Sequence, residues 1–398
     1  MIASIAETDD PQASYLITAW GRICRTLGSQ FAQFLPNVMT PLLESAALKP
    51  DFAIIDGIFS RRLDSHIDEI EKEQYAAEDG WDFVPLHGQQ VGIKTTILEE
   101  KCTAYEMLCC YAQELKGDFF PYVPKVLNDL IIPGLKFYFH DGVRAAAARC
   151  LPHLVESAKE ANPHDLSVPN QIFRTVIDEL LKRIKDEGSP EIASDFYDAF
   201  YETIDIAGNN CLTTHDMDSF IEVTAGQLTE YGTRKTQRDE QLASGERDIE
   251  EDEDIKEETE ADEVLLSSIS KSIHTIFKRH KLGFLPIWAK MIPYVEAGLG
   301  STDMNTRSWA ICIIDDVIEY CGSESLYYIE QYLNQLITSV TDDCISPLNT
   351  TNLSVGNQTS CCVWCGCCSP SRRATTCQVL RNGTRPTVPM HRTAKRSG

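Results

Sequence analysis

Apolar residues recur about every three to four positions through most of this sequence, and short polar turns interrupt them. In the stretch Leu135–Ala148, LKFYFHDGVRAAAA, an apolar run ends at Phe139 and an alanine-rich run of helical period follows. Asp141 lies between the two runs as a candidate N-cap, and Arg144 follows one turn later. The pattern predicts two helices joined by a tight turn, which is one helical hairpin.

The same pattern returns along the chain. A second clear copy has a helix at 285–299, a turn with Asp303 and Arg307, and a helix at 309–321. Weaker copies pair 31–46 with 97–116, 168–185 with 191–206 and 215–231 with 264–281, and another begins at 325–340. Repeats of this kind are typical of HEAT proteins, whose period is about 40–47 residues. We therefore predict an all-α HEAT-repeat superhelical solenoid of about five to six hairpins, without β-sheet and with a disordered C-terminal tail.

Two charged stretches interrupt the repeats. The first, within residues 49–96, is expected to be an exposed acidic loop of mixed helix and coil that ends near Trp81 and Phe83. The alternative is a plain insertion between repeats. The second, Glu246–Glu263, is either a disordered linker or an acidic arm that captures a Lys/Arg-rich partner. We divide the chain into HEAT hairpin elements (1–48), an acidic inter-repeat insertion (49–96), HEAT repeats (97–230), a charged acidic insertion (231–263), HEAT repeats (264–344) and the tail (345–398).

The tail differs in composition from the rest. It has no acidic residue, little helical period and six cysteines between 361 and 377. Cys362 and Cys365 have the spacing of metal ligands, but a structural zinc site usually needs a second, distant pair. A shifted reading frame in the gene model explains this segment better, because suitable codons for 358–380, read one base earlier, spell a plausible second helix for the last hairpin.

Charge restricts the possible partners. The 398 residues are 43% hydrophobic, enough for a large core, and they contain 36 basic and 60 acidic residues, a net charge of −24. Residues 1–344 contain all the acids but only 29 of the basic residues, so they carry −31. Such a surface repels DNA and attracts basic proteins, although an even charge for solubility would have the same composition. We expect no membrane span, because no apolar run of 18 residues occurs, and no secretion signal.

Motifs of catalysis or of cofactor binding are not found. The histidines lack the spacing of a helical zinc site, and neither a glycine-rich phosphate loop nor a nucleophile elbow occurs. Asp315, Asp316 and Glu319 fall on about one helix face. Acid–base work would require a closed pocket, so these acids suit a basic peptide better, unless they form a solvated face. We predict no enzyme activity, no metal and no cofactor.

Four stretches resemble the importin-β family of nuclear transport receptors. They are DDPQASYLITAWGRICRTLG (Asp9–Gly28), DGWDFVPL (Asp79–Leu86), LKFYFHDGVRAAAA and WAICIIDDVIEYC (Trp309–Cys321), in the family's order and with similar spacing over about residues 7–345. The acidic insertion also lies where the family has one. The resemblance implies a segment that shuttles between cytoplasm and nucleus, with Ran GTPase, nuclear pore proteins and basic cargo such as ribosomal proteins and histones as partners of the full-length receptor.

The resemblance also implies which residues bind cargo. The family holds cargo on an inner surface lined by the second helix of each hairpin, which would place Trp309, Asp315, Asp316 and Glu319 on or near that surface. The acidic arm adds the run Glu250, Glu251, Asp252, Glu253 and Asp254. Two functions remain open: a cargo-binding segment of a transport receptor, and a HEAT scaffold that positions the partners of a multiprotein complex.

Overall fold

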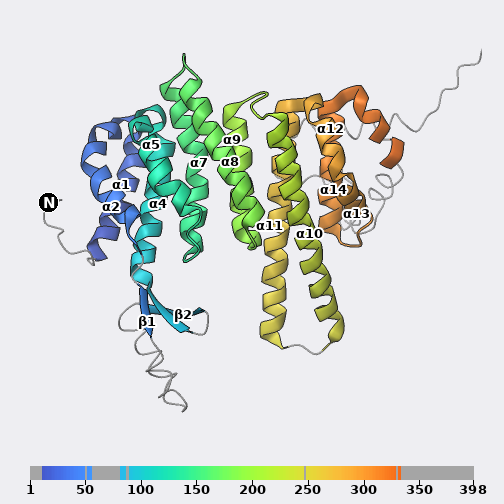
Figure 1. Ribbon diagram of the computed structural model, residues 1–398, viewed down its shortest axis with the longest axis horizontal. Coiled ribbons are helices and arrows are strands. Elements are labelled where there is room, and N and C mark those ends of the chain that lie inside the picture. Colours follow the sequence, from blue (N-terminus) through green and yellow to red (C-terminus); the bar gives the residue numbers. More distant parts are fainter. Residues whose placement is uncertain are drawn as a thin grey trace, which may run out of the picture.

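Antiparallel helices stacked side by side make up the protein (Figure 1). The computed structural model describes residues 11–49, 52–55, 81–86, 89–245, 248–328 and 330–332. Each second helix packs on the next second helix along the array. This second-helix layer consists of α1 (Pro11–Leu27), α4 (Thr95–Leu115), α7 (Asp141–Ala161), α9 (Pro190–Ala207), α11 (Ile249–His280) and α14 (Met304–Cys321).

The first helices of the hairpins form the other layer. They are η2 (Gly28–Phe34) with α2 (Leu35–Ala47), the continuous path η3 (Lys116–Tyr122), α5 (Val123–Lys125), η4 (Val126–Ile131) and α6 (Ile132–Gly134), then α8 (Ser167–Asp186) and α10 (Thr214–Ser244), and finally α12 (Leu285–Trp288), η6 (Ala289–Met291) and α13 (Ile292–Leu299). Short 3₁₀ turns, η5 (Lys281–Gly283) and η7 (Gly322–Ser325), connect later elements. The described ranges thus hold five hairpins preceded by α1, which confirms the predicted helical solenoid.

The first helices are irregular where they contain proline. Pro121, Pro124 and Pro133 lie in one helical path that changes from 3₁₀ to α to π and back to α. Proline has no N–H to donate and its ring clashes with the preceding turn, so a regular α-helix cannot continue through these positions. Each second helix, in contrast, is one continuous α-helix.

Small side chains let the second helices approach one another. Ala146, Ala147 and Ala148 of α7 are at most 1% exposed, and α7 packs along both α4 and α9. Lysines of the second helices add polar ties to the ends of neighbouring helices. The Lys101 ammonium donates to the carbonyls of Ala46 (2.5 Å) and Leu48 (3.1 Å) at the end of α2. Lys159 donates in the same way to Ile206 (2.6 Å) and Ala207 at the end of α9. A cation at a helix C-terminus offsets the partial negative charge of the unpaired carbonyls.

The turn before α7 differs in one detail from the expectation. The N-cap is His140, whose Nδ1 accepts from the Val143 N–H at 3.3 Å, and Asp141 is the first residue of the helix. Asp141 instead accepts from Arg144 at 2.6 Å, and Arg144 also pairs with the buried Glu187 in the turn between α8 and α9. In the later turn, Asp303 caps α14 by accepting from the Thr306 N–H, and Arg307 donates to the carbonyls of Ser301 and Thr302.

A small sheet within the first insertion contradicts the expectation of mixed helix and coil without β-structure. β1 (Phe52–Ile55), β2 (Trp81–Leu86) and β3 (Gln89–Lys94) form an antiparallel sheet in the order β1-β3-β2, with Phe52 opposite Ile93 and Trp81 opposite Lys94. The segments are short and contain β-branched and aromatic residues, which favour strands over helices of so few residues. The acidic residues at 56–80 lie outside the described ranges.

The second insertion is a long helical hairpin, so the disordered-linker alternative is wrong. α10 has 31 residues and α11 has 32, and together they project beyond the neighbouring helices (Figure 1). Asp248 and Glu251 form a reciprocal capping box at the start of α11, where acidic side chains also meet the positive end of the helix dipole. The expected end of the last repeat, 333–344, and the tail, 345–398, lie outside the described ranges.

Candidate partner-binding surface

A row of acidic side chains lies on the face of α9 that is turned away from its buried side. Asp195, Asp198, Glu202 and Asp205 follow one another at helical spacing, and we call these four residues the α9 acidic stripe. Between them Phe196, Tyr197 and Phe200 point into the core and are fully buried. Because α9 lies at the centre of the second-helix layer, the stripe faces outward between α7 and α11.

Cations from the two neighbouring helices pair with this stripe. Arg149 of α7 lies 3.6 Å from Asp195, and Lys271 of α11 lies 3.6 Å from Asp198. Lys278 and Arg279 bind the carboxylate of Asp205 at 2.8 Å and 2.7 Å. Acidic and basic rows therefore alternate across the layer, and the stripe is partly neutralised within the molecule itself.

Burial and charge act on these acids in opposite directions. Burial raises the pKa of Asp195 and of Glu202, while Arg149 and His153, respectively, act against it. Burial also acts to raise the pKa of Asp205, but hydrogen bonds from Lys278 and Arg279 outweigh it, and this pKa is lowered. An added cation would favour the charged form of Asp195 and Glu202, so both carboxylates stand to gain from a basic ligand.

An open pocket of about 340 Å³ lies where the stripe meets α11. Its lining consists of Tyr201, Glu202, Asp205, Ile206, Thr275 and Lys278. The chain itself shows which group suits this place, because the Lys271 ammonium lies 5.6 Å from the centre of the Tyr201 ring. An aromatic face beside carboxylates favours an ammonium or guanidinium group. The pocket therefore suits a lysine or arginine side chain.

The four residues expected on this surface in α14 do not all lie there. Trp309 is 6% exposed and packs near Gly298 of α13, so it belongs to the core. Asp316 is also 6% exposed, and it pairs with His274 Nδ1 of α11 at 2.6 Å. Asp315 is half-buried and Glu319 is exposed. Adjacent residues on a helix point about 100° apart, so Asp316 turns towards α11 whereas Asp315 does not.

The acidic run at the start of α11 is exposed. Glu250, Glu251, Asp252, Glu253 and Asp254 all lie near the free end of the hairpin that α10 and α11 form beyond Tyr231, which we call the arm. Leu242 (47% exposed) and Ile249 (80% exposed) lie close to the same end. The arm thus presents many negative charges and two apolar side chains away from the solenoid.

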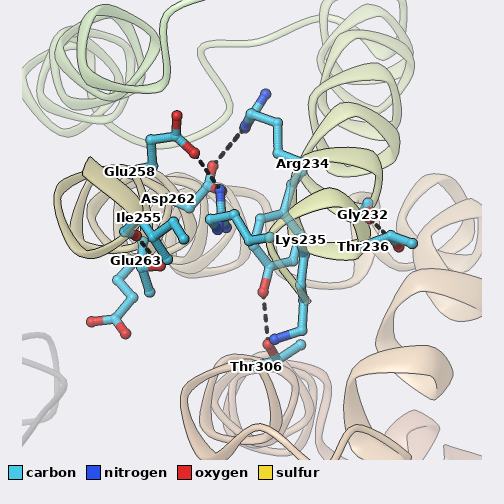
Figure 2. Close-up of polar contacts among 12 residues, drawn as sticks. Gly232, Arg234, Lys235, Thr236, Ile255, Glu258, Asp262, Glu263 and Thr306 are labelled. Atoms are coloured by element: carbon cyan, nitrogen blue, oxygen red, sulfur yellow. Dashed lines mark hydrogen bonds and ion pairs between the residues drawn. The ribbon is translucent and has the colours of Figure 1, made fainter. Parts of the chain in front are cut away.

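Buried ion pairs hold the two helices of the arm together (Figure 2). Asp262 of α11 is 1% exposed and accepts from Arg234 at 2.6 Å and from Arg238 at 2.5 Å. At its base the arm also contacts the start of the next second helix. The Tyr231 and Thr306 hydroxyls lie 2.8 Å apart, Lys235 lies 3.7 Å from Asp303, and Asn305 donates to Glu263. The arm is therefore fixed to the solenoid at one end.

The α9 acidic stripe was missed in the sequence, although its signal is there. The spacing Asp195, Asp198, Glu202, Asp205 marks one face of a helix, whereas the hairpin is predicted from the apolar positions of that segment alone.

In the described ranges, no group of three or more His, Cys, Asp or Glu side chains could hold a metal ion. None of the described helices has an apolar stretch long enough to span a membrane.

Comparison with known proteins identifies relatives of the whole array. A family model described as importin repeat 6 matches residues 192–301. Importin subunit beta-3 of Saccharomyces cerevisiae is 30% identical over 341 residues, which are 86% of this chain and 29% of the relative. A probable importin-5 homolog of Dictyostelium discoideum is 25% identical over 329 residues, 80% of this chain and 28% of that protein.

Solved structures agree with the sequence matches. The crystal structure of Kap121p bound to RanGTP has a TM-score of 0.65 at 28% identity and covers 87% of this chain and 30% of that one. The crystal structure of Kap121p bound to Pho4p has a TM-score of 0.66 at 29% identity, covering 85% and 29%. The chain spans less than a third of the length of the relatives that it matches.

Proposed function

Because this chain belongs to the importin, or karyopherin, family, we propose that it is the part of a nuclear transport receptor that binds basic cargo proteins without catalysing a reaction. The observation that carries this proposal is the likeness to Kap121p, whose solved structures include complexes with Pho4p, Ste12p, the SUMO protease Ulp1p and RanGTP. Transport through the pore, binding of Ran and of pore proteins, and shuttling between cytoplasm and nucleus belong to the same proposal. The matches favour it over a general HEAT scaffold.

The α9 acidic stripe is the proposed contact for cargo. Its carboxylates lie on the second-helix layer, next to a pocket that suits a lysine or arginine side chain. Cargo cations would replace Lys271 and Lys278 as partners of Asp198 and Asp205, so binding is an exchange of ion pairs rather than the filling of an empty acidic groove. Such an exchange costs little, because each internal pair is partly exposed and contributes only about 0.2–1 kcal/mol.

Two further acidic regions support the stripe in this proposal. Asp315 and Glu319 of α14 extend the acidic rows of the layer beyond the basic row of α11, whereas the buried Asp316 and Trp309 support the helix from inside. The arm, through Glu250–Asp254, provides a second contact at a distance. Lys/Arg-rich proteins such as ribosomal proteins and histones have the matching charge, and DNA does not.

A binding titration tests the stripe directly. The full chain is titrated against a fluorescent Lys/Arg-rich peptide, and anisotropy is followed at low salt and at 0.15 M and 1 M salt, where the Debye length falls to about 8 Å and about 3 Å. The variant Asp195→Asn/Asp198→Asn/Glu202→Gln keeps the shape and removes three charges. Loss of three partly exposed contacts should weaken binding about 5- to 30-fold at low salt, and much less at 1 M salt.

The matched control removes the same charge from the other layer. The variant Asp178→Asn/Glu222→Gln/Glu230→Gln changes three exposed acids of α8 and α10, so bulk charge is equal but the stripe is intact. We expect this control to bind within about twofold of the parent. Equal losses in both variants would show that the peptide responds to net charge alone, and no loss in the stripe variant would place cargo recognition elsewhere.

A further inference from the structure

The pocket beside the α9 acidic stripe has two ends, and only one of them is paired within the molecule. At the paired end, Asp205 Oδ1 accepts from Lys278 Nζ at 2.8 Å, and from Arg279 Nη2 at 2.7 Å and Nε at 3.1 Å. Tyr201 and Glu202 line the other end. In the described part of the chain, no lysine or arginine forms an ion pair with Glu202. The carboxylate that remains for a ligand of this pocket is therefore that of Glu202.

An ammonium group of the chain itself already lies beside the Tyr201 ring. Lys271 of α11 places its Nζ 5.6 Å from the ring centre. The same Nζ is 3.6 Å from Asp198 Oδ1, too far for a hydrogen bond, and this buried oxygen has no hydrogen-bond donor among the described residues. A lysine from a ligand would have to displace Lys271 from the ring, and it would bring only the same kind of group to the same place.

A guanidinium group suits this end of the pocket better than an ammonium group does. It is planar and weakly hydrated, so it stacks on an aromatic ring, and its fork of N–H groups binds a carboxylate through two parallel hydrogen bonds. Tyr201 and Glu202 both line the pocket, so one guanidinium can use the ring and the carboxylate together. The apolar stem of the arginine can lie along Ile206, which also belongs to the lining.

We propose that this pocket selects arginine over lysine, with Tyr201 as the stacking surface and Glu202 as the carboxylate that accepts from the guanidinium. This selectivity rests on the proposed function, because the arginine belongs to a basic cargo protein held at the α9 acidic stripe. Net charge alone does not distinguish the two side chains, since both carry one positive charge. Stacking and the paired hydrogen bonds should favour an arginine ligand by about 3- to 10-fold over a lysine ligand of equal charge.

Two fluorescent peptides of equal charge test the selectivity. One contains four arginines separated by Gly-Ser pairs, and the other has lysines at the same positions. The full chain is titrated with each peptide at about 0.15 M salt, and anisotropy gives the ratio of the two dissociation constants. The parent should prefer the arginine peptide about 3- to 10-fold. Tyr201→Leu and Glu202→Gln should each bring the ratio close to 1, whereas Tyr201→Phe, which keeps the ring, should retain the preference.

The lysine that lies beside the ring provides an independent test. Lys271→Met leaves the Tyr201 ring open to an ammonium group, so it should tighten binding of the lysine peptide more than that of the arginine peptide, and the ratio should fall. The matched control Lys290→Met removes a lysine that pairs with Asp218 on the other layer, and it should leave the ratio unchanged. Asp195→Asn, at the far end of the stripe, should weaken binding of both peptides equally.

Loss of selectivity and loss of binding are separate results. Equal affinities of the two peptides for the parent, or an unchanged ratio in Tyr201→Leu, would overturn the selection of arginine. The proposed function would still stand in that case if the triple stripe variant weakened binding of both peptides. If neither peptide bound the parent even at low salt, both proposals would be wrong. Circular dichroism confirms that each variant is folded.

Discussion

Removal of Arg144 should destabilise the centre of the solenoid far more than removal of its exposed partner. Arg144 pairs with two carboxylates of very different exposure: the side chain of Glu187 is 7% exposed, and that of Asp141 is 67% exposed. An exposed pair contributes about 0–1 kcal/mol, whereas breaking a buried pair by removing one partner costs about 3–5 kcal/mol. We therefore expect Asp141→Ala to lose at most about 1 kcal/mol and Arg144→Met to lose about 3–5 kcal/mol.

A double variant separates the ion pair from the packing. Replacing both partners, Arg144→Met with Glu187→Met, leaves no unpaired buried charge and should regain most of the loss. About 1 kcal/mol should remain, because Glu187 Oε1 also accepts from the Ser189 N–H at the start of α9. Urea unfolding followed by circular dichroism gives the free energies. Amide exchange at residues 141–148 detects local opening, which a repeat protein can undergo without global unfolding. An Arg144→Met loss no larger than that of Asp141→Ala, or a double variant that is the least stable of the set, would contradict a buried ion pair at this turn.

Two further changes test polar ties between a second helix and the first helix beside it. Burial lowers the pKa of Lys101 to about 8 from its usual 10.5, so the unfolded chain binds more protons between these values and this group makes stability rise with pH there. Between pH 8 and 10.5, the free energy of unfolding of the parent, measured by urea denaturation, should therefore rise by about 1–3 kcal/mol relative to that of Lys101→Met. A difference between the two proteins that stays constant over this pH range would contradict the prediction. In the arm, Asp262→Asn leaves Arg238 buried without its full countercharge, and limited trypsin digestion should cut faster at Arg234 and Arg238. Glu258→Gln, at an exposed position 3.8 Å from Arg238, should leave the digestion unchanged.

Sequence periodicity was enough to predict the hairpins whose helices bury a regular apolar stripe. The helices expected at 285–299 and 309–321 correspond to α12–α13 and α14, because their apolar positions pack on neighbours that follow directly in the chain. The arm has no such stripe in Glu246–Glu263, and what makes it a helix is the capping box at Asp248 and the pairing of Asp262 with α10. Pairing across a hairpin is not visible in a local window of sequence.

The surface was predicted less well than the fold for a similar reason. Asp316 seemed equivalent to Asp315, but His274, which is 42 residues away in the chain, determines that Asp316 is buried. Likewise, the strength of the α9 acidic stripe depends on Lys271 and Lys278, which reach it only after the repeats have stacked. Local spacing indicates which helix face carries charge, whereas the countercharge comes from the next repeat.

The arm is fixed to the solenoid at its base and free at its other end, so it can act as a lever. From Tyr231 to the turn at Gly245 the helix rises about 20 Å, at about 1.5 Å per residue. Tyr231 and Lys235 contact Thr306 and Asp303, so the pivot lies against the first turn of α14 (Figure 2). A partner that pulls on the free end exerts a torque on this pivot, and a small displacement there changes the angle between two successive repeats. In a stack of repeats, such a change of angle displaces all later repeats. A partner that binds only weakly at the tip of the arm can therefore alter the curvature of the array.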